Sequence, residues 1–209
     1  MQASRRNPGV RGMQRATDEE LLGALKAGDT DSLGSLVVRW EQPLFRFVYR
    51  MLPRQEDAHD ICQETFLRIL RKAHKFRPGS RFSTWMYQIA LNLCRDQLRR
   101  RKRWGLLLAE EHGLNEQTTE LPVERRDDFD PAISVERRER NSAVTRALRE
   151  IPAEQREVLV LKEFEGLKFR EIAEILDCPE STVKSRMYYG LKGLRTALIE
   201  GGFAGSLSE

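Results

Sequence analysis

The 209-residue sequence lacks the features that mark secreted, membrane-spanning and metal-binding proteins. It has only three cysteines, far apart and without a CxxC or Cys/His pairing, so neither a disulfide framework nor a zinc site is indicated. No apolar run approaches the roughly 20 residues that a bilayer span requires. The arginines of residues 1–17 are not followed by an apolar core, which argues against a signal peptide. We therefore expect a cytoplasmic protein with reduced thiols, no membrane insertion, no metal and no cofactor.

The net charge of +4 hides an uneven distribution of charge along the chain. Residues 1–17 hold four basic and no acidic residues, and residues 18–103 hold 17 basic and 11 acidic ones. Residues 104–140 hold five basic and ten acidic residues, whereas residues 141–209 are nearly balanced, with ten basic and 11 acidic. The chain thus divides into a basic block, an acidic connector and a near-neutral block.

Helical periodicity of apolar residues dominates the chain, and strand-type alternation is nearly absent. Thr17 and Glu20 form a capping box that marks the start of the first helix, and Pro43 is expected to kink or divide the next one. Between residues 106 and 135 the periodicity fades and charged residues accumulate. We predict an all-α protein of two helical domains joined by a flexible acidic linker. The predicted segments are a disordered basic arm at 1–16, a first domain at 17–104, the linker at 105–135, a second domain at 136–200 and a flexible tail at 201–209.

The most specific pattern lies near the C-terminus and has the spacing of a helix-turn-helix. A short amphipathic helix over 169–176 is followed by a turn over 177–179 and by a second helix from about Glu180. The second helix has a predicted apolar inner stripe at Val183, Met187, Leu191 and Leu194. Its outer face carries the candidate contacts to duplex DNA, which are Ser181, Thr182, Lys184, Ser185, Arg186 and Tyr189.

Positive charge is concentrated on this second helix, because residues 181–196 contain four basic residues and no acidic one. Phosphate attraction and major-groove contacts require such a helix. A helical hairpin with a solvated basic face is the less favoured alternative. Of Tyr188 and Tyr189, one is expected to pack against the preceding helices instead of contacting DNA.

Residues 147–159, 165–176 and 179–186 resemble region 4 of sigma factors, most closely that of the extracytoplasmic-function (ECF) sigma factors of bacterial RNA polymerase. The resemblance implies that this domain reads the minus-35 promoter element in duplex DNA and contacts the flap of the second-largest polymerase subunit. Two positions depart from the family pattern. Asp177 stands where glycine is frequent, although aspartate tolerates the left-handed conformation. Tyr189-Gly190 stands where Arg-Ala is common, which leaves the promoter sequence open.

Asp57, Asp60 and Glu64 are spaced three and four residues apart, so they share one face of a helix in an otherwise basic block. No histidine cluster or second acidic pair accompanies them, which disfavours acid-base catalysis. A solvated face is one alternative, and a docking surface for a basic protein is the favoured interpretation. The stretch resembles sigma region 2.2, which implies that the clamp of the largest subunit of core RNA polymerase is bound by Asp57, Asp60, Gln63 and Glu64.

Aromatic and basic residues over 76–103 are typical of single-stranded DNA binding, because unstacked bases need flat apolar partners and the backbone needs cations. Phe82 and Trp85 are expected in the core from their apolar spacing. The stretch resembles ECF regions 2.3 and 2.4, which implies melting of the minus-10 element and capture of a non-template base. The candidate contacts to this melted DNA are Phe76, Arg77, Ser80, Asn92, Arg95, Arg99 and Arg100.

Together these patterns predict an ECF-type sigma factor that binds core polymerase and both promoter elements and is not an enzyme. The resemblance also implies an anti-sigma factor as a partner, and a linker that threads the RNA path of the polymerase; from composition alone a flexible spacer is equally compatible.

The competing interpretation is a stand-alone helix-turn-helix regulator. It needs a ligand or receiver domain, and residues 18–103 show no βα alternation. A nuclease or base-modifying enzyme is more distant, because no nucleophile or metal-ligand set is visible.

Overall fold

The computed structural model describes residues 16–52, 54–77, 79–112 and 135–202, and all regular structure in these ranges is helical. The N-terminal domain consists of α2 (Asp18–Lys26), α3 (Asp31–Met51), α4 (Gln55–Lys72), the 3₁₀ turn η1 (Ala73–Lys75) and α5 (Phe82–His112). The C-terminal domain consists of α6 (Val135–Glu150), α7 (Ala153–Leu159), the π-helical turn η2 (Val160–Phe164), α8 (Phe169–Leu176) and α9 (Glu180–Glu200). The predicted all-α class with two helical domains is confirmed in this part of the chain. None of the described helices combines the length and the apolar character needed to cross a bilayer.

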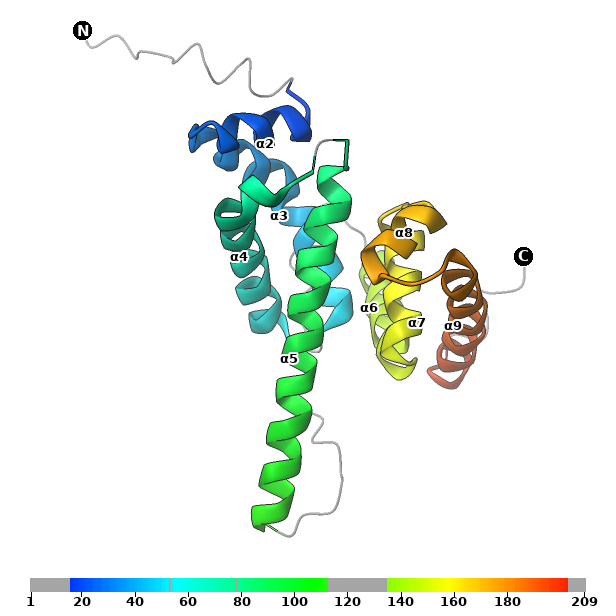
Figure 1. Ribbon diagram of the computed structural model, residues 1–209. Helices are drawn as coiled ribbons and strands as arrows, with labels where there is room; N and C mark the ends of the chain where they lie inside the picture. Colours follow the sequence, from blue (N-terminus) through cyan, green and yellow to red (C-terminus); the bar gives the residue numbers. More distant parts are fainter. Residues whose placement is uncertain (1–15, 53, 78, 113–134, 203–209) are drawn as a thin grey trace, which may run out of the picture.

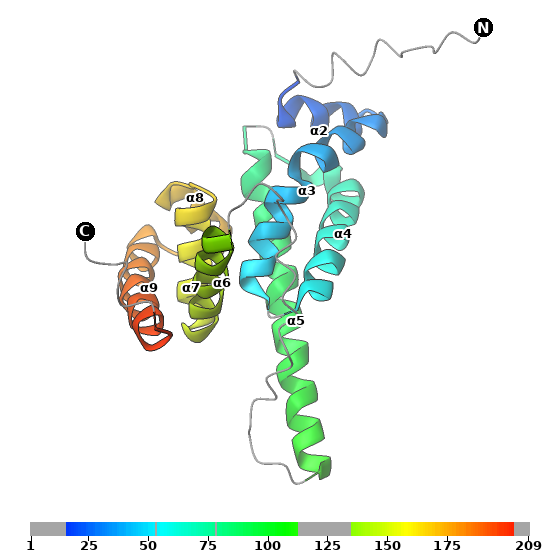
Figure 2. The same ribbon diagram turned by 180° about the vertical axis from the view of Figure 1, so that it is seen from behind.

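The two domains lie side by side (Figures 1 and 2). Helices α3, α4 and α5 run alongside one another, α2 lies across one end of them, and α5 extends well beyond the other end. The C-terminal domain packs α8 against α5, and it packs α6, α7 and η2 against α3. Helix α9 lies on the side away from the N-terminal domain, against α6, α7 and α8. Most of the predicted basic arm, residues 113–134 of the predicted linker and most of the predicted tail lie outside the described residues.

The start of α2 confirms the predicted capping box. The Thr17 hydroxyl accepts a hydrogen bond from the Glu20 amide (3.2 Å), and the Glu20 carboxylate accepts one from the Thr17 amide (2.7 Å). Asp18, in the first helical turn, accepts hydrogen bonds from Arg39 (2.5 Å) and from the indole of Trp40 (3.0 Å). The same turn therefore begins α2 and fastens it to α3.

Pro43 lies inside α3, which runs without a break from Asp31 to Met51. The expectation that proline divides this segment is wrong. A proline in a helix interior costs about 3 kcal/mol. The buried side chains of Leu44, Phe47 and Val48 follow it directly, and each contributes about 1.5–3 kcal/mol on burial. Packing of this stripe outweighs the lost backbone hydrogen bond.

Helix α5 continues to His112, past the predicted domain end at residue 104. The residues after Gly105 are mainly leucine, alanine and glutamate, which are strong helix formers. Once a helix is nucleated, residues of high propensity continue it without periodic apolar spacing. Loss of periodicity was therefore a poor marker of the helix end.

The core of the N-terminal domain forms between α3, α4 and α5. Phe82 and Phe47 are fully buried in it, and Trp85 is partly buried against it, as predicted. Cys62 and Cys94 are buried free thiols, and burial raises the pKa of Cys62 to about 12 and also raises that of Cys94. Both thiols are therefore protonated and unreactive at neutral pH.

The inner stripe of α9 differs from the predicted one at one position. Val183 and Met187 are buried as predicted, but Leu191 is 47% exposed and Gly190 is buried in its place. At about 100° per residue, position 190 lies closer to the centre of the stripe than position 191. The prediction for Leu191 was wrong because it considered only large apolar residues. The contact between α9 and α7 is made by glycine.

We expect Gly190→Val to destabilise the C-terminal domain by about 1–3 kcal/mol, because overpacking a close contact forces neighbours to shift. A Cβ atom at position 190 meets Leu159 Cδ1 at 3.1 Å and the Gln155 Cβ at 3.3 Å, where α9 crosses α7. The free energy of unfolding in urea, followed by circular dichroism, measures the effect. The matched control is Gly34→Ala in α3, whose new Cβ meets nothing within 4 Å; it should stabilise the chain by about 0.5–1 kcal/mol. Equal effects of the two changes would contradict the close approach.

Candidate nucleic-acid interface

The helix-turn-helix is built by α8, a tight turn and α9. Asp177 ends α8 in the left-handed conformation, with φ 51°. It is the one non-glycine residue with positive φ in the described part of the chain, and aspartate is among the side chains that adopt this conformation most readily. At the start of α8, the Glu171 carboxylate accepts a hydrogen bond from the Lys168 amide (2.8 Å). Both ends of the short helix are thus capped, which sets the direction in which α9 leaves the turn.

The outer face of α9 is exposed along several turns and faces away from the N-terminal domain. Ser181, Lys184 and Ser185 are exposed on it, as the sequence predicted. Lys184 pairs with Glu180 one turn earlier, at 2.8 Å. An exposed pair of this kind contributes little stability, so the ammonium group remains available to a phosphate.

Thr182 and Arg186 lie on the flank of this face and are only partly exposed. The Arg186 guanidinium pairs with Glu154 of α7 at 2.5 Å and approaches the Cys178 Sγ at 4.0 Å. Arg186 therefore links α9 to α7 and to the turn, and a DNA contact would require it to leave Glu154.

Tyr188 and Tyr189 are both exposed, at 68% and 58%, and their rings meet edge to face. The expectation that one of them packs against the preceding helices is wrong. Helical geometry places Tyr188 on the same stripe as Ser181 and Ser185, whereas Tyr189 borders a groove with Gln155 of α7. Tyr188 is the residue that sequence reasoning left out of the candidate set, although the spacing 181, 185, 188 could have identified it.

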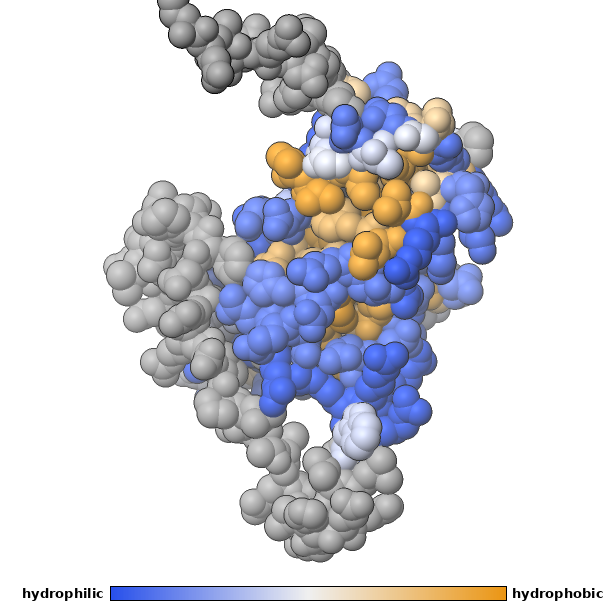
Figure 3. Space-filling view, turned by 90° about the vertical axis from the view of Figure 1, so that its left-hand side faces the viewer, coloured by the Kyte–Doolittle hydropathy of each residue, from blue (hydrophilic) through white to orange (hydrophobic). Residues whose placement is uncertain are grey.

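Helix α4 carries the predicted acidic face on the opposite side of the molecule from α9. Asp60 and Gln63 are exposed, and Glu64 is partly exposed. Glu64 accepts a hydrogen bond from Arg68 at 2.8 Å, which lowers the pKa of its carboxyl group. Leu67 and Leu70 continue the face and are 44% and 40% exposed. Figure 3, which views this side of the molecule, shows apolar side chains gathered near the α2 end and hydrophilic ones farther along.

Asp57 differs from the other acidic residues of α4, because its carboxylate is mostly buried. It pairs with Arg101 of α5 and accepts a hydrogen bond from Gln97 at 3.0 Å. Only 14% of the Asp57 side chain is exposed. Asp57 thus joins α4 to α5 in this structure. Its low exposure does not support a docking role for its side chain.

Phe76, predicted to contact melted DNA, is only 8% exposed. Its ring packs against Trp85, with the ring centroids 5.4 Å apart, and lies under the Lys26 ammonium at 5.5 Å. The Lys26 ammonium also donates a hydrogen bond to the Phe76 carbonyl (2.7 Å). The aromatic ring therefore anchors the loop before α5 and does not present a face for base stacking. The neighbouring Arg77 and Ser80 are exposed.

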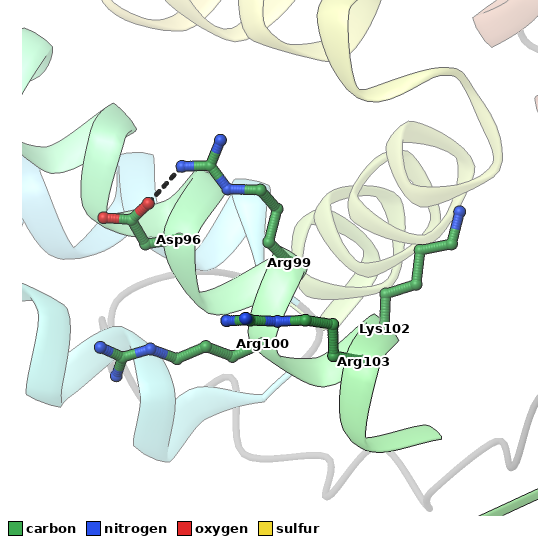
Figure 4. Close-up of a pocket in the computed structure, with 5 residues that line it drawn as sticks. All are labelled: Asp96, Arg99, Arg100, Lys102 and Arg103. Atoms are coloured by element: carbon green, nitrogen blue, oxygen red, sulfur yellow. Dashed lines mark hydrogen bonds and ion pairs between the residues drawn. The ribbon is translucent and has the colours of Figure 1, made fainter. Parts of the chain in front are cut away.

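The outer face of α5 presents the remaining candidates. Asn92 is exposed, and Arg99 and Arg100 are exposed two turns farther along. A pocket of about 590 Å³ is lined by Asp96, Arg99, Arg100, Lys102 and Arg103, and Figure 4 shows how these side chains lie along α5. Asp96 is the one acidic residue in the lining, and it pairs with Arg99. The lining therefore offers no carboxylate to Arg100, Lys102 and Arg103. Arg95, by contrast, pairs with Glu157 of the C-terminal domain.

Both domains match known protein families. Residues 36–104 match the family described as sigma-70 region 2, and residues 141–194 match sigma-70 region 4. The first match contains α4 and the first part of α5, and the second contains the whole helix-turn-helix. The two families thus cover all three candidate surfaces, on α4, on α5 and on α9.

Curated relatives match over most of their length. The sequence is 34% identical to the ECF RNA polymerase sigma factor SigW of Bacillus subtilis over 174 residues, which cover 83% of this chain and 92% of that protein. It is 30% identical to the ECF RNA polymerase sigma-E factor of Escherichia coli K12 over 175 residues, which cover 84% of this chain and 91% of that protein.

Solved structures share the fold. CnrH, in complex with the cytosolic domain of CnrY, matches with a TM-score of 0.64 and 23% identity over 88% of this chain and 97% of CnrH. The sigma factor RpoE, in complex with the anti-sigma factor NepR from Bartonella quintana, matches with a TM-score of 0.61 and 22% identity over 79% and 95% of the two chains.

Proposed function

The chain belongs to the ECF sigma factors of the sigma-70 family, and on this premise we propose how its surfaces act in transcription initiation. It is an RNA polymerase sigma factor, so its task is to bring core polymerase to promoters, and the chain itself performs no chemistry. One observation carries the proposal. Two exposed surfaces suited to DNA, on α5 and α9, lie on different domains, and a third surface on α4 is acidic at one end and apolar at the other.

The α4 surface is the proposed docking site for the clamp of the largest polymerase subunit. Asp60 and Gln63 are the exposed polar residues, with Glu64 beside them. Leu67 and Leu70 add exposed apolar area next to the acidic group, as in interfaces whose apolar centre is bordered by charge. The clamp surface that fits this face is basic, with an apolar strip beside it.

The outer face of α5 and the loop before it form the proposed binding surface for the melted minus-10 element. Arg77 and Ser80 of the loop, with Asn92, Arg99 and Arg100 of α5, supply cations and polar groups. Asn92 is an exposed amide that is suited to hydrogen-bond a base edge. Unstacking costs a few kcal/mol per base, and contacts to the backbone and to the captured base offset this cost.

The outer stripe of α9 is the proposed reader of the minus-35 element. Ser181, Lys184, Ser185 and Tyr188 share it, with Thr182, Arg186 and Tyr189 on its flanks. A helix of this kind enters the major groove, where hydroxyl groups and cations contact base edges and phosphates. We propose that Tyr188 contributes apolar contact area there.

An anti-sigma factor is the proposed regulatory partner. This is supported by the fold shared with RpoE, which was solved in complex with an anti-sigma factor. A cytoplasmic location follows from the proposed partners, because core polymerase and promoter DNA are found there. A stand-alone regulator is not favoured, because the sigma-70 families match both domains.

Reconstituted transcription tests this function. The purified full chain is added to core RNA polymerase with a library of promoter fragments, and promoter-directed transcripts are sequenced. We expect transcripts that start at a fixed distance from a shared pair of upstream elements, and none from core polymerase alone. No transcript from any fragment, together with tight binding of the chain alone to duplex DNA, would instead favour the stand-alone regulator.

The role of Asn92 can be tested separately from polymerase binding. Asn92→Ala should lower open-complex formation about tenfold, because a lost base contact is worth about 1–3 kcal/mol, while affinity for core polymerase stays within about twofold. Permanganate footprinting measures the open complex, and fluorescence anisotropy measures core binding. Asn141→Ala, an exposed amide of α6, is the matched control and should leave both unchanged. Equal losses in the two assays for Asn92→Ala would indicate a structural role.

A further inference from the structure

Two side chains of α2 hold the two ends of the loop between η1 and α5. The Lys26 ammonium donates a hydrogen bond to the Phe76 carbonyl at the start of the loop (2.7 Å). The Glu19 carboxylate accepts one from the Phe82 amide at its end (2.9 Å). The partners are 50 and 63 positions apart in the sequence, and Figures 1 and 2 show α2 beside this loop. These contacts are therefore tertiary, and no sequence motif predicted them.

Helix α2 is itself fixed in place, so it can support the loop. Glu19 and Lys26 are seven residues apart, which places them on one face of α2 and about 10 Å apart along its axis. The three leucines of α2 are buried, and Asp18 is bonded to Arg39 and Trp40 of α3. The two side chains that reach the loop thus extend from a helix that is packed against the core.

The start of α5 depends on Glu19 because it has no local side-chain cap. Arg81 precedes the first helical residue, and its carbonyl accepts a hydrogen bond from the Trp85 amide (3.3 Å). An arginine side chain has no acceptor, so it cannot cap the helix as serine or aspartate does. The first amides of a helix lack partners within it. The Glu19 carboxylate supplies an acceptor to the Phe82 amide and a negative charge at the positive end of the helix.

The loop between these two ends has little internal support. Gly79 adopts the left-handed conformation, with φ 81°, which suits a residue without a Cβ atom. The Ser80 amide donates a hydrogen bond to the Arg77 carbonyl (3.2 Å), and this is the one backbone bond within the described loop residues 77 and 79–81. Arg77 and Ser80 belong to the proposed minus-10 surface and are exposed. The places of their side chains therefore depend on how the ends of the loop are held.

We propose that Glu19 and Lys26 are positioning residues for minus-10 recognition, although neither belongs to the proposed DNA surface. By holding both ends of the loop they order it before DNA binds, so that less conformational entropy is lost when a base is captured. A loop released at either end still carries the charge of Arg77, but it selects the base less well. This inference rests on the proposed minus-10 surface.

A direct effect of charge is the competing explanation, because Glu19 and Lys26 are both exposed. In that case the Glu19 carboxylate repels the DNA backbone, and its removal strengthens binding. Lys26 then contacts a phosphate, and its removal weakens binding and also lowers the salt dependence. Positioning predicts instead that removal of either group weakens recognition.

The first test separates the hydrogen bond of Glu19 from its charge. Glu19→Met removes both, whereas Glu19→Gln removes the charge but keeps a carbonyl oxygen that can accept the Phe82 amide. The full chain is assayed with core polymerase on a promoter selected from the fragment library. We expect Glu19→Met to lower open-complex formation about tenfold, as for the loss of one charge-assisted hydrogen bond, and Glu19→Gln to stay within about threefold of wild type. Permanganate footprinting measures the open complex.

The second test separates positioning by Lys26 from a phosphate contact. Holoenzyme binding is measured with forked promoter fragments whose minus-10 segment is single-stranded, with each of its bases substituted in turn. We expect Lys26→Met to weaken binding of the preferred fragment about fivefold and to narrow its ratio to the substituted fragments, with the slope of log Kd against log salt unchanged. Loss of a phosphate contact would lower this slope by about 0.7 and leave the ratio as it is. Lys75→Met, at an exposed lysine next to the loop, is the matched control and should keep the wild-type ratio.

Further readouts separate the possible failures. Affinity for core polymerase should stay within about twofold in every variant, and a loss equal to the loss of opening would show that α2 only stabilises the domain, which overturns the positioning role. Equal gains in opening for Glu19→Met and Glu19→Gln would reduce the effect to charge and also overturn it. If Arg77→Ala lowers opening but Glu19→Met does not, the positioning role fails and the minus-10 surface stands. If Arg77→Ala also leaves opening unchanged, the proposed minus-10 surface fails and the inference fails with it.

Discussion

Asp60→Arg is expected to lower the affinity of the chain for core RNA polymerase by about 100-fold, which corresponds to about 2.7 kcal/mol. Asp60 is exposed at the acidic end of the α4 face. The substitution replaces an attractive contact with a basic partner by a repulsive one, and the juxtaposition of like charges at an interface costs several kcal/mol. Biolayer interferometry with immobilised core polymerase measures the dissociation constant and its salt dependence.

Two further variants serve as controls for this result. Glu174→Arg makes the same charge change at an exposed position of α8, and it should leave core affinity within about threefold. Asp57→Asn should mainly reduce the stability of the N-terminal domain, because the mostly buried Asp57 carboxylate pairs with Arg101. Core binding that is unchanged by Asp60→Arg would reject the assignment of the clamp surface to α4.

Phe82→Ala is expected to reduce the free energy of unfolding of the N-terminal domain by about 3–5 kcal/mol. Phe82 is fully buried and its ring packs against Trp40, with centroids 6.0 Å apart. Its backbone amide also donates a hydrogen bond to the Glu19 carboxylate of α2 at 2.9 Å. Truncating the side chain removes apolar burial and leaves a cavity at the start of α5. Urea denaturation followed by tryptophan fluorescence reports the change.

The control for Phe82→Ala is Leu191→Ala. Leu191 is 47% exposed on α9, and its truncation should cost less than about 1 kcal/mol. Phe82→Ala should also impair promoter opening, because the N-terminal end of α5 anchors the loop that carries Arg77 and Ser80. A small loss of stability at Phe82, similar to that at Leu191, would contradict its place in the core.

Features that depend on short segments were predictable. The capping box of Thr17 and Glu20, the left-handed Asp177 and the buried Phe82 all follow from neighbouring residues and helical spacing. The exposed polar and basic face of α9 is of the same kind. Local rules suffice here because the interacting groups lie within a few residues of one another.

Features that depend on packing were not predictable in this way. Apolar spacing placed Leu191 inside, but the close approach of α9 to α7 favours Gly190 there. Phe76 has the aromatic character of a base-stacking residue, and only the positions of Trp85 and Lys26 show that its ring is enclosed. Periodicity also ended before α5 did, because residues of high helix propensity continue a helix without periodic apolar spacing.

The sequence by itself determined the helices, the division into two domains, the family and the side-chain types available to each surface. These depend on local spacing and on short motifs, which can be recognised without knowing the fold. The tertiary structure decided which of those side chains are free. It pairs Arg95 with Glu157, 62 positions apart, and Asp57 with Gln97, 40 positions apart, so two charged residues that look equally available in the sequence are already occupied. An ion pair forms where the fold brings two charges together, and sequence distance carries little information about that.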